Sequence, residues 1–178
     1  SDASVVSKCV KLVSRFLYES RDDKIRIEAA KLLSAFGPNS RAFSTLCRVL
    51  SSLSKKSFEH SELQIALIEA IPKTAPFSPQ AARALLKVVE KEYGADPSVQ
   101  KAALKALGEV RTTASVECLL TAMLKLSPDP NDPQDAFGGN DAKRMNWESV
   151  GETLYASLEK LTGVKQEGGL QRGGLEYR

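Results

Sequence analysis

The 178-residue chain contains few of the side chains on which enzymes and metalloproteins rely. It has a single histidine, three cysteines and one tryptophan, and aromatic residues make up only 6% of the sequence. His60 has no patterned Ser or Cys partner, and no Cys/His cluster has the spacing of a metal site. No glycine-rich loop suited to phosphate binding occurs. We therefore expect no enzyme activity, no cofactor and no metal ion.

The sequence also lacks a strong charge of one sign and a long apolar run. Its net charge is +3, and basic residues alternate with acidic ones, whereas nucleic-acid-binding proteins gather Lys and Arg on one face. We expect a solvated helix face, and no nucleic-acid partner, even in the more basic first third. No stretch reaches the ~18 apolar residues of a membrane span, so we expect none. Residues that make the first third more basic are Lys8, Lys11, Arg15, Arg41, Arg48, Lys55 and Lys56.

One apolar pattern, by contrast, occurs four times. From each leading residue, apolar side chains follow at positions +4, +5, +7, +8 and usually +11, which places them on one broad face of an α-helix. The residue at +7 is small in three of the four copies. A period of about 40 residues is typical of stacked helical pairs. The leading residues, 38, 36 and 51 positions apart, are Ile25, Leu63, Val99 and Val150.

A partner helix is predicted before each patterned one. No segment alternates apolar and polar residues with the period of two that is typical of strands, so we predict an all-α fold. Residues 127–146 are rich in Pro, Gly and Asp without an apolar stripe, and we interpret them as an irregular insertion. The result is one unit, residues 1–163, followed by a Gly-rich tail at residues 164–178. The predicted partner helices span about residues 3–20, 40–54, 79–93 and 112–126.

The cysteines fit this repeat. Cys9 and Cys47 each precede the leading residue of the next patterned helix by 16 positions, so they occupy equivalent places in successive repeats. Stacked helices lie roughly 8–10 Å apart, too far for a disulfide. We expect these two, and Cys118, to be small buried hydrophobes. This slightly favours the cytoplasm, but the chain begins at Ser1 without Met, so export stays open.

Residues 95–108, ADPSVQKAALKALG, resemble the second helix of a HEAT repeat, most of all the bacterial, phycobilisome-lyase-like variety. Residues 23–30 are similar and keep the Arg of that pattern at Arg26. The other repeats have Gln or Gly there, so the Asp–Arg ladder of the family is mostly absent. The likeness covers roughly residues 20–163. It implies a right-handed α-solenoid of about four HEAT-like helical pairs, which most often serves as a scaffold or adaptor.

The resemblance also indicates a candidate binding face. In HEAT arrays the patterned helices line the concave side, so their +2 and +6 positions would face outward. We predict that these positions bind a partner, because adjacent isoleucines are unusual on a solvated face. The alternative is a surface ion-pair ladder of small energetic value, beside isoleucines partly covered by curvature. The predicted partner-binding residues are Ile27, Ile65 and Lys101 at +2, and Lys31, Glu69 and Lys105 at +6.

We therefore expect a non-enzymatic module that binds or scaffolds another protein, or a peptide, on the concave face of a helical-repeat array. The alternative is a HEAT-like enzyme or nucleic-acid-binding protein that uses the basic N-terminal third. Salt-dependent binding of duplex DNA would favour that alternative, because neutralised phosphates release counterions.

Overall fold

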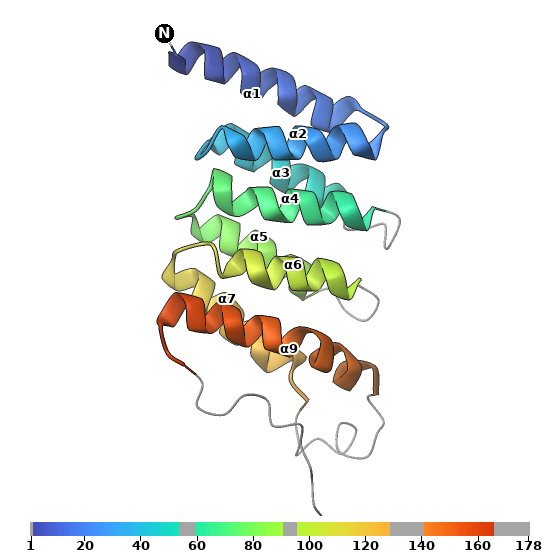
Figure 1. Ribbon diagram of the computed structural model, residues 1–178, viewed down its shortest axis with the longest axis vertical. Helices are drawn as coiled ribbons and strands as arrows, with labels where there is room; N and C mark the ends of the chain where they lie inside the picture. The colour runs from blue at the N-terminus through green and yellow to red at the C-terminus, as the bar shows by residue number, and fades with distance from the viewer. Residues whose placement is uncertain (1, 54–59, 91–95, 129–140, 166–178) are drawn as a thin grey trace, which may run out of the picture.

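The computed structural model describes residues 2–53, 60–90, 96–128 and 141–165 (Figure 1). Within these residues every regular element is an α-helix and no strand occurs, so the predicted all-α class is confirmed. None of the described helices is long and apolar enough to cross a membrane. The helices are α1 (Asp2–Glu19), α2 (Asp23–Ala35), α3 (Ser40–Leu53), α4 (Ser61–Thr74), α5 (Pro79–Val89), α6 (Pro97–Leu107), α7 (Thr113–Leu126) and α9 (Asp141–Thr162).

The helices stack along one long axis in two layers (Figure 1). The front layer consists of α2, α4, α6 and α9, which carry the repeated apolar pattern, and each of them packs on the next. Behind it lie α3, α5 and α7, each packed against the front-layer helix that follows it in the chain. The first helix, α1, lies across one end of the stack and contacts α2 and α3.

One apolar cluster joins the two layers, and the repeated pattern supplies much of it. In α4 the leading residue, Leu63, and the +4 residue, Leu67, are both fully buried. Burying a leucine side chain stabilises a fold by about 1.5–3 kcal/mol, so these contacts dominate the stability of the stack. The largest fully buried side chains are Leu17, Leu33, Leu46, Leu63, Leu67, Ile68, Ile71, Leu85, Leu104, Leu107, Leu119 and Leu154.

Short polar side chains cap the N-termini of several helices. The Asp22 carboxylate accepts a hydrogen bond from the backbone N–H of Lys24 at 2.8 Å and caps α2. Asp96 accepts one from the backbone N–H of Ser98 at 2.9 Å and caps α6. Gly37, after α2, has a φ of 72°, a left-handed conformation that glycine adopts without strain.

The irregular insertion ends earlier than predicted. We expected residues 127–146 to be irregular, but α9 already begins at Asp141. The sequence Ala-Lys-Arg-Met after Asp141 consists of good helix formers, and the acidic Asp141 favours the positive end of the helix dipole. The rest of the insertion, residues 129–140, and residues 166–178 of the tail lie outside the described residues.

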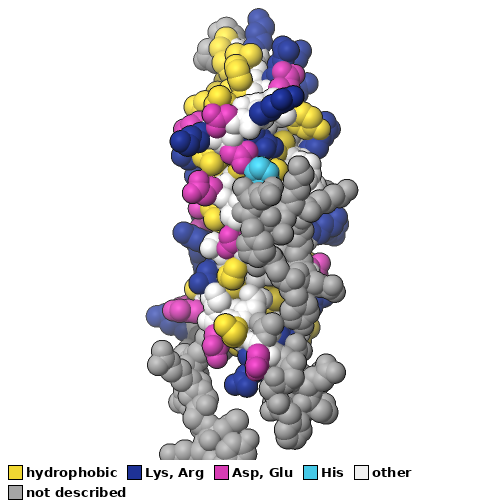
Figure 2. Space-filling model, turned by 90° about the vertical axis from the view of Figure 1, so that its right-hand side faces the viewer, with side chains coloured by type: hydrophobic (Ala, Val, Ile, Leu, Met, Phe, Trp, Pro, Cys, Tyr) yellow, Lys and Arg dark blue, Asp and Glu magenta, His cyan; other side chains and the backbone are white. Residues whose placement is uncertain are grey.

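The first repeat departs from the predicted burial. Ile25 and Leu32, at the leading and +7 positions of α2, are about half exposed, whereas their counterparts in α4, α6 and α9 are buried. Phe16 of α1, which the sequence placed on an inward stripe, is exposed as well. The cause is positional, because among the described residues α2 has no front-layer helix before it. Figure 2 shows hydrophobic side chains gathered at this end of the molecule.

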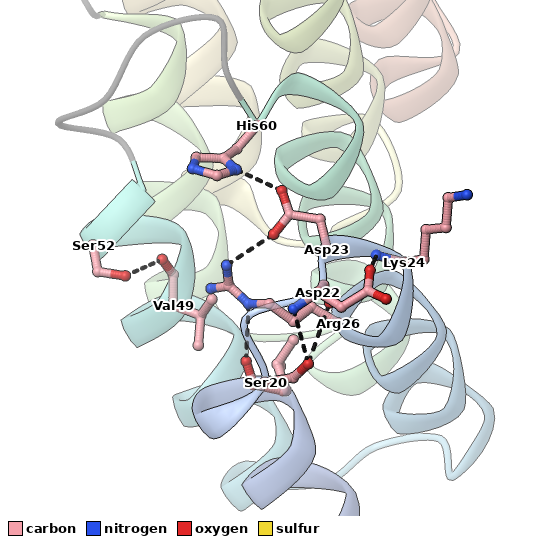
Figure 3. A network of polar contacts seen from close by, with 9 residues as sticks. Ser20, Asp22, Asp23, Lys24, Arg26, Val49, Ser52 and His60 are labelled. Atoms are coloured by element: carbon pink, nitrogen blue, oxygen red, sulfur yellow. Dashed lines mark hydrogen bonds and ion pairs between the residues drawn. The ribbon is translucent and has the colours of Figure 1, made fainter.

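Polar side chains connect the beginning of α2 to its neighbours (Figure 3). One oxygen of Asp23 lies 2.5 Å from Nδ1 of His60, the residue that precedes α4. The other oxygen accepts a hydrogen bond from Nη1 of Arg26 at 3.1 Å. Arg26 also donates from Nε to the backbone carbonyl of Leu17 at 3.2 Å, so the network joins α1, α2 and the start of α4.

Similar contacts join the later helices of the front layer. Hydrogen bonds from the Ser61 side chain of α4 and from the backbone N–H of Ser98 hold the pKa of Asp96 below its ordinary value of 3.8. Further along, Lys160 of α9 forms an ion pair with Glu109, just after α6. Apolar burial is non-directional, so these polar contacts fix how far one helix slides along the next.

The front layer is tight where α6 meets α9. A Cβ atom added to Gly108, at the end of α6, would lie 3.0 Å from Cβ of Ser157 in α9. Ser157 holds the +7 position of its repeat, where α4 and α6 have Ala70 and Ala106. At this seam, the small residue of the pattern therefore stands where two helices come closest.

Replacing Gly108 with Val should destabilise the fold by roughly 1–3 kcal/mol, because the added methyl groups collide with Ser157 across a packed seam. Denaturant unfolding of G108V, S157G and the double variant measures the coupling between the two sites. We expect the double variant to be more stable than the sum of the single effects predicts. Strict additivity would mean that α6 and α9 are not in close contact at this point.

Candidate partner-binding groove

The four charged residues predicted to bind a partner all lie on the surface. Lys31, Glu69, Lys101 and Lys105 are exposed on α2, α4 and α6. The structure brings two of them together, because Glu69 and Lys105 line one groove between α4 and α6. Lys31 instead pairs with Glu28 of its own helix, with Nζ 2.7 Å from Oε1. Among the described residues no ion pair joins Lys31, Glu69 and Lys105, so a ladder between these three does not form.

The two predicted isoleucines are less accessible than the sequence suggested. Ile27 and Ile65 are only partly exposed, and both pack against the apolar core. The +2 position lies at the edge of the buried face, so neighbouring core residues already cover part of each isoleucine side chain. A partner can contact their exposed atoms, but replacing either residue also removes core packing. Neither residue lines the groove that contains Glu69 and Lys105.

The groove has a volume of about 570 Å³ and lies at the C-terminal ends of α4 and α6. Its apolar wall includes Phe77, whose side chain is 68% exposed in the turn that leads to α5. An exposed aromatic ring beside a groove is the kind of side chain that anchors protein interfaces. The residues that line the groove are Glu69, Pro72, Lys73, Pro76, Phe77, Ala102, Lys105, Ala106, Glu109 and Arg111.

Two prolines shape this part of the structure. Pro72 lies in the last turn of α4, and Pro76 follows in the turn, where the fixed φ of proline stiffens the backbone. The backbone N–H of Arg111 donates to the carbonyl oxygen of Pro76 at 2.8 Å, which holds the turn after α6 against the turn after α4. Ser78 then caps α5. The wall of the groove is therefore held by a backbone contact between the two turns.

The charges around the groove are mostly basic. Lys73 and Lys105 lie in the last turns of α4 and α6, where a positive charge also favours the negative end of the helix dipole. Of the two acids on the rim, Glu109 is already paired with Lys160. In the part of the chain that is described, Lys73, Lys105 and Arg111 form no ion pair. The rim therefore presents a local excess of positive charge beside an aromatic ring.

Of the ten residues that line the groove, only Glu69 and Lys105 were predicted from the sequence. Phe77 and Arg111 lie in turns, where the helical apolar pattern that guided the analysis has no meaning. The available signal was Phe77 itself, a large apolar residue between Pro76 and the Ser78-Pro79 pair, in a segment where turn residues are common.

The rest of the described surface offers little for catalysis. His60 is engaged with Asp23 in the network that joins α2 to α4, and its side chain does not cap α4. No group of three His, Cys, Asp or Glu side chains in the described residues could hold a metal ion. All three cysteines are free; Cys118 is buried as predicted, while Cys9 and Cys47 are only partly so.

A second groove, of about 640 Å³, lies in the back layer between α3 and α5. These two helices do not form a packed seam over their described residues, unlike α1 with α3 and α5 with α7. Cys47 lines this groove together with Arg83 and Lys87. Burial raises the pKa of the Cys47 thiol from 9.0 to about 11, because desolvation disfavours the thiolate. A thiol that is almost fully protonated near neutral pH is a poor nucleophile.

We therefore expect Cys47 to react slowly with iodoacetamide. At pH 8, a pKa that is two units higher lowers the thiolate fraction about 100-fold relative to an ordinary thiol. Site-resolved mass spectrometry can compare Cys47 with the introduced thiol of L124C, since Leu124 is largely exposed on α7. The Cys47 rate should keep rising up to about pH 11, whereas a rate that levels off by pH 9 would contradict the raised pKa.

Comparisons with known proteins give this groove no precedent. No family model matches the sequence, and no curated protein or solved structure is significantly similar to it.

Proposed function

We propose that the chain is a non-enzymatic protein-interaction module, a right-handed α-solenoid of about four HEAT-like helical pairs, that binds a peptide segment of a partner protein. The binding site is the groove between α4 and α6. The observation that carries this proposal is that Glu69 and Lys105, both predicted to bind a partner, line the same groove. Its apolar wall contains the exposed Phe77.

The arrangement of the helices supports the repeat interpretation. Each front-layer helix packs on the next, from α2 through α4 and α6 to α9, and each has a partner packed against it. In repeat proteins a unit contacts only its neighbours, and extended surfaces between units serve as binding sites. A groove at the junction of two units is therefore the expected place for a ligand in such an array.

The chemistry of the groove specifies the kind of peptide. Phe77 and Pro76 offer apolar surface at the groove, and the proline ring loses no rotamer freedom when it is covered. The basic rim, with Lys73 and Lys105, favours acidic residues in the partner. We therefore propose a ligand with one apolar side chain that packs on Phe77, flanked by Asp or Glu. The apolar contact supplies most of the affinity, and the rim charges mainly raise the association rate.

A random peptide library displayed on phage provides the probe for this proposal. Selected peptides should contain an apolar residue flanked by Asp or Glu, and fluorescence polarisation then gives their affinities. F77D should weaken binding at least tenfold, which corresponds to about 1.4 kcal/mol. Because Phe77 is largely exposed, the melting temperature of F77D should stay close to that of the wild type.

The chain offers a matched control for the charges. Lys105 lines the groove and Lys101 lies one turn away on the same exposed side of α6, outside it. K105E should weaken peptide binding several-fold, and more at low salt than at high salt, whereas K101E should have little effect. Equal loss in both variants would mean that the site includes the predicted +2 and +6 positions in general and is not confined to the groove. Undiminished peptide binding by F77D would refute the proposal. Tighter binding of duplex DNA than of any selected peptide would also refute it.

A further inference from the structure

The end of the stack formed by α1 and α2 is an apolar face. On α1, besides the buried stripe through Val10 and Leu17, a second stripe recurs at the spacing i, i+4, i+7 and i+11. On α2, Ile25 and Leu32 are 48% and 53% exposed. A shallow groove of about 480 Å³ lies between the two helices. The end face, as we define it, consists of Val5, Cys9, Leu12 and Phe16 of α1 with Ile25 and Leu32 of α2, and the buried Ala29 lies between the last two.

The inner repeats show what such a face normally meets. Leu63 of α4, Val99 of α6 and Val150 of α9 hold the same position as Ile25, and all three are buried. In each case the front-layer helix of the preceding repeat packs on that side, α2 on α4, α4 on α6 and α6 on α9. Only the first repeat leaves the position open among the described residues.

A terminal repeat that stays in water normally has a polar outer face, because the array is otherwise poorly soluble. Here the outer positions are occupied by large apolar side chains, and Phe16, at 52% exposed, is among them. A contiguous patch of exposed apolar side chains marks an interaction site. The end face is therefore expected to be covered.

The residue at +7 is larger in the first repeat than in the inner repeats. The inner repeats have Ala70, Ala106 and Ser157 at this position, and at Ser157 the neighbouring helix comes so close that a Cβ on Gly108 would lie 3.0 Å away. The first repeat has Leu32 instead. The larger side chain of Leu32 favours a wider spacing than the one seen where α6 meets α9.

We propose that the end face binds the end face of a second copy of this chain, around a two-fold axis. The spacing i, i+4, i+7, i+11 reads the same in both directions, so two such stripes match when the helices run antiparallel. Ile25 of one copy then packs on Leu32 of the other, with the small Ala29 close to the axis. On α1, Val5 likewise meets Phe16 of the other copy. A two-fold interface uses one patch twice, as this arrangement does.

Charge and size agree with self-pairing. Glu28, which borders the groove near the proposed axis, is already paired with Lys31 of its own helix at 2.7 Å, so two copies do not bring bare carboxylates together. A helix of 18 residues, the length of α1, is ~27 Å long, and two helices side by side are ~20 Å wide. The projected area is then about 500 Å² per copy, which is below the roughly 800 Å² that each partner buries in a standard interface and agrees with a weak, reversible dimer.

Sedimentation velocity of the whole chain over a range of concentrations tests the proposal. We expect a monomer–dimer equilibrium that L32E shifts at least tenfold towards monomer and that L32E with F16E abolishes. The matched control is L124E, which introduces the same charge at a residue that is 78% exposed on α7. Its dimer should be unchanged. Leu32, Phe16 and Leu124 are all exposed, so circular dichroism should report the same helicity for every variant.

Disulfide trapping tests the geometry. The thiols of an I25C chain and an L32C chain should cross-link when the two proteins are mixed and oxidised, with mass spectrometry identifying the joined peptides. The two positions point at each other across the proposed interface, so their Cα atoms lie closer than the helix axes, each being ~2.3 Å from its own axis. I25C alone should not cross-link at this position, because its two copies would be separated by about seven residues of helix, ~10 Å, beyond the ~7 Å limit between Cα atoms. A wild-type chain that is monomeric at 200 µM, a dimer that survives L32E with F16E, or cross-links that form equally in unmixed samples would each overturn the proposal.

Discussion

The whole stack depends on how closely neighbouring front-layer helices approach. A single helical pair of this chain cannot bury its own apolar face, because that face is wider than the partner helix behind it. The next front-layer helix must cover the remainder, and it can do so only if the residues at the crossing are small. Ala70, Ala106 and Ser157 meet that requirement, and Gly108 faces Ser157 without a side chain. Leu67 and Leu104, beside these small residues, are fully buried as a result.

This dependence explains what could be predicted from the sequence. Burial in a stacked array repeats with the helix, so the spacing of apolar residues located the front-layer helices, and residues such as Asp22 and Asp96 located their starts. The same spacing does not say whether a neighbour is present. Ile25 therefore has the same pattern as the buried Leu63 and yet stays half exposed. Only the three-dimensional order of the helices separates the two cases.

The candidate groove shows a second limit. Glu69 and Lys105 could be predicted because they lie on regular helices at a fixed offset from the core. Phe77 and Arg111 could not, because the path of a turn depends on tertiary contacts such as the hydrogen bond from Arg111 to Pro76. Ile27 and Ile65 were predicted to face outward, but both are partly buried, because the edge of a buried face is set by the tilt of neighbouring helices. Half-burial of this kind is a property of packing and is absent from the periodicity of one helix.

The open space between α3 and α5 has a mechanical consequence. At the level where the front layer is continuous through α4 and α6, the back layer has a groove instead of a packed seam. Bending that brings α3 towards α5 therefore disrupts little apolar packing until the space between them closes. We expect the stack to bend most easily at the α4–α6 junction. The candidate groove lies at the same level, at the C-terminal ends of α4 and α6. A ligand that contacts both helices there would therefore restrain this bending.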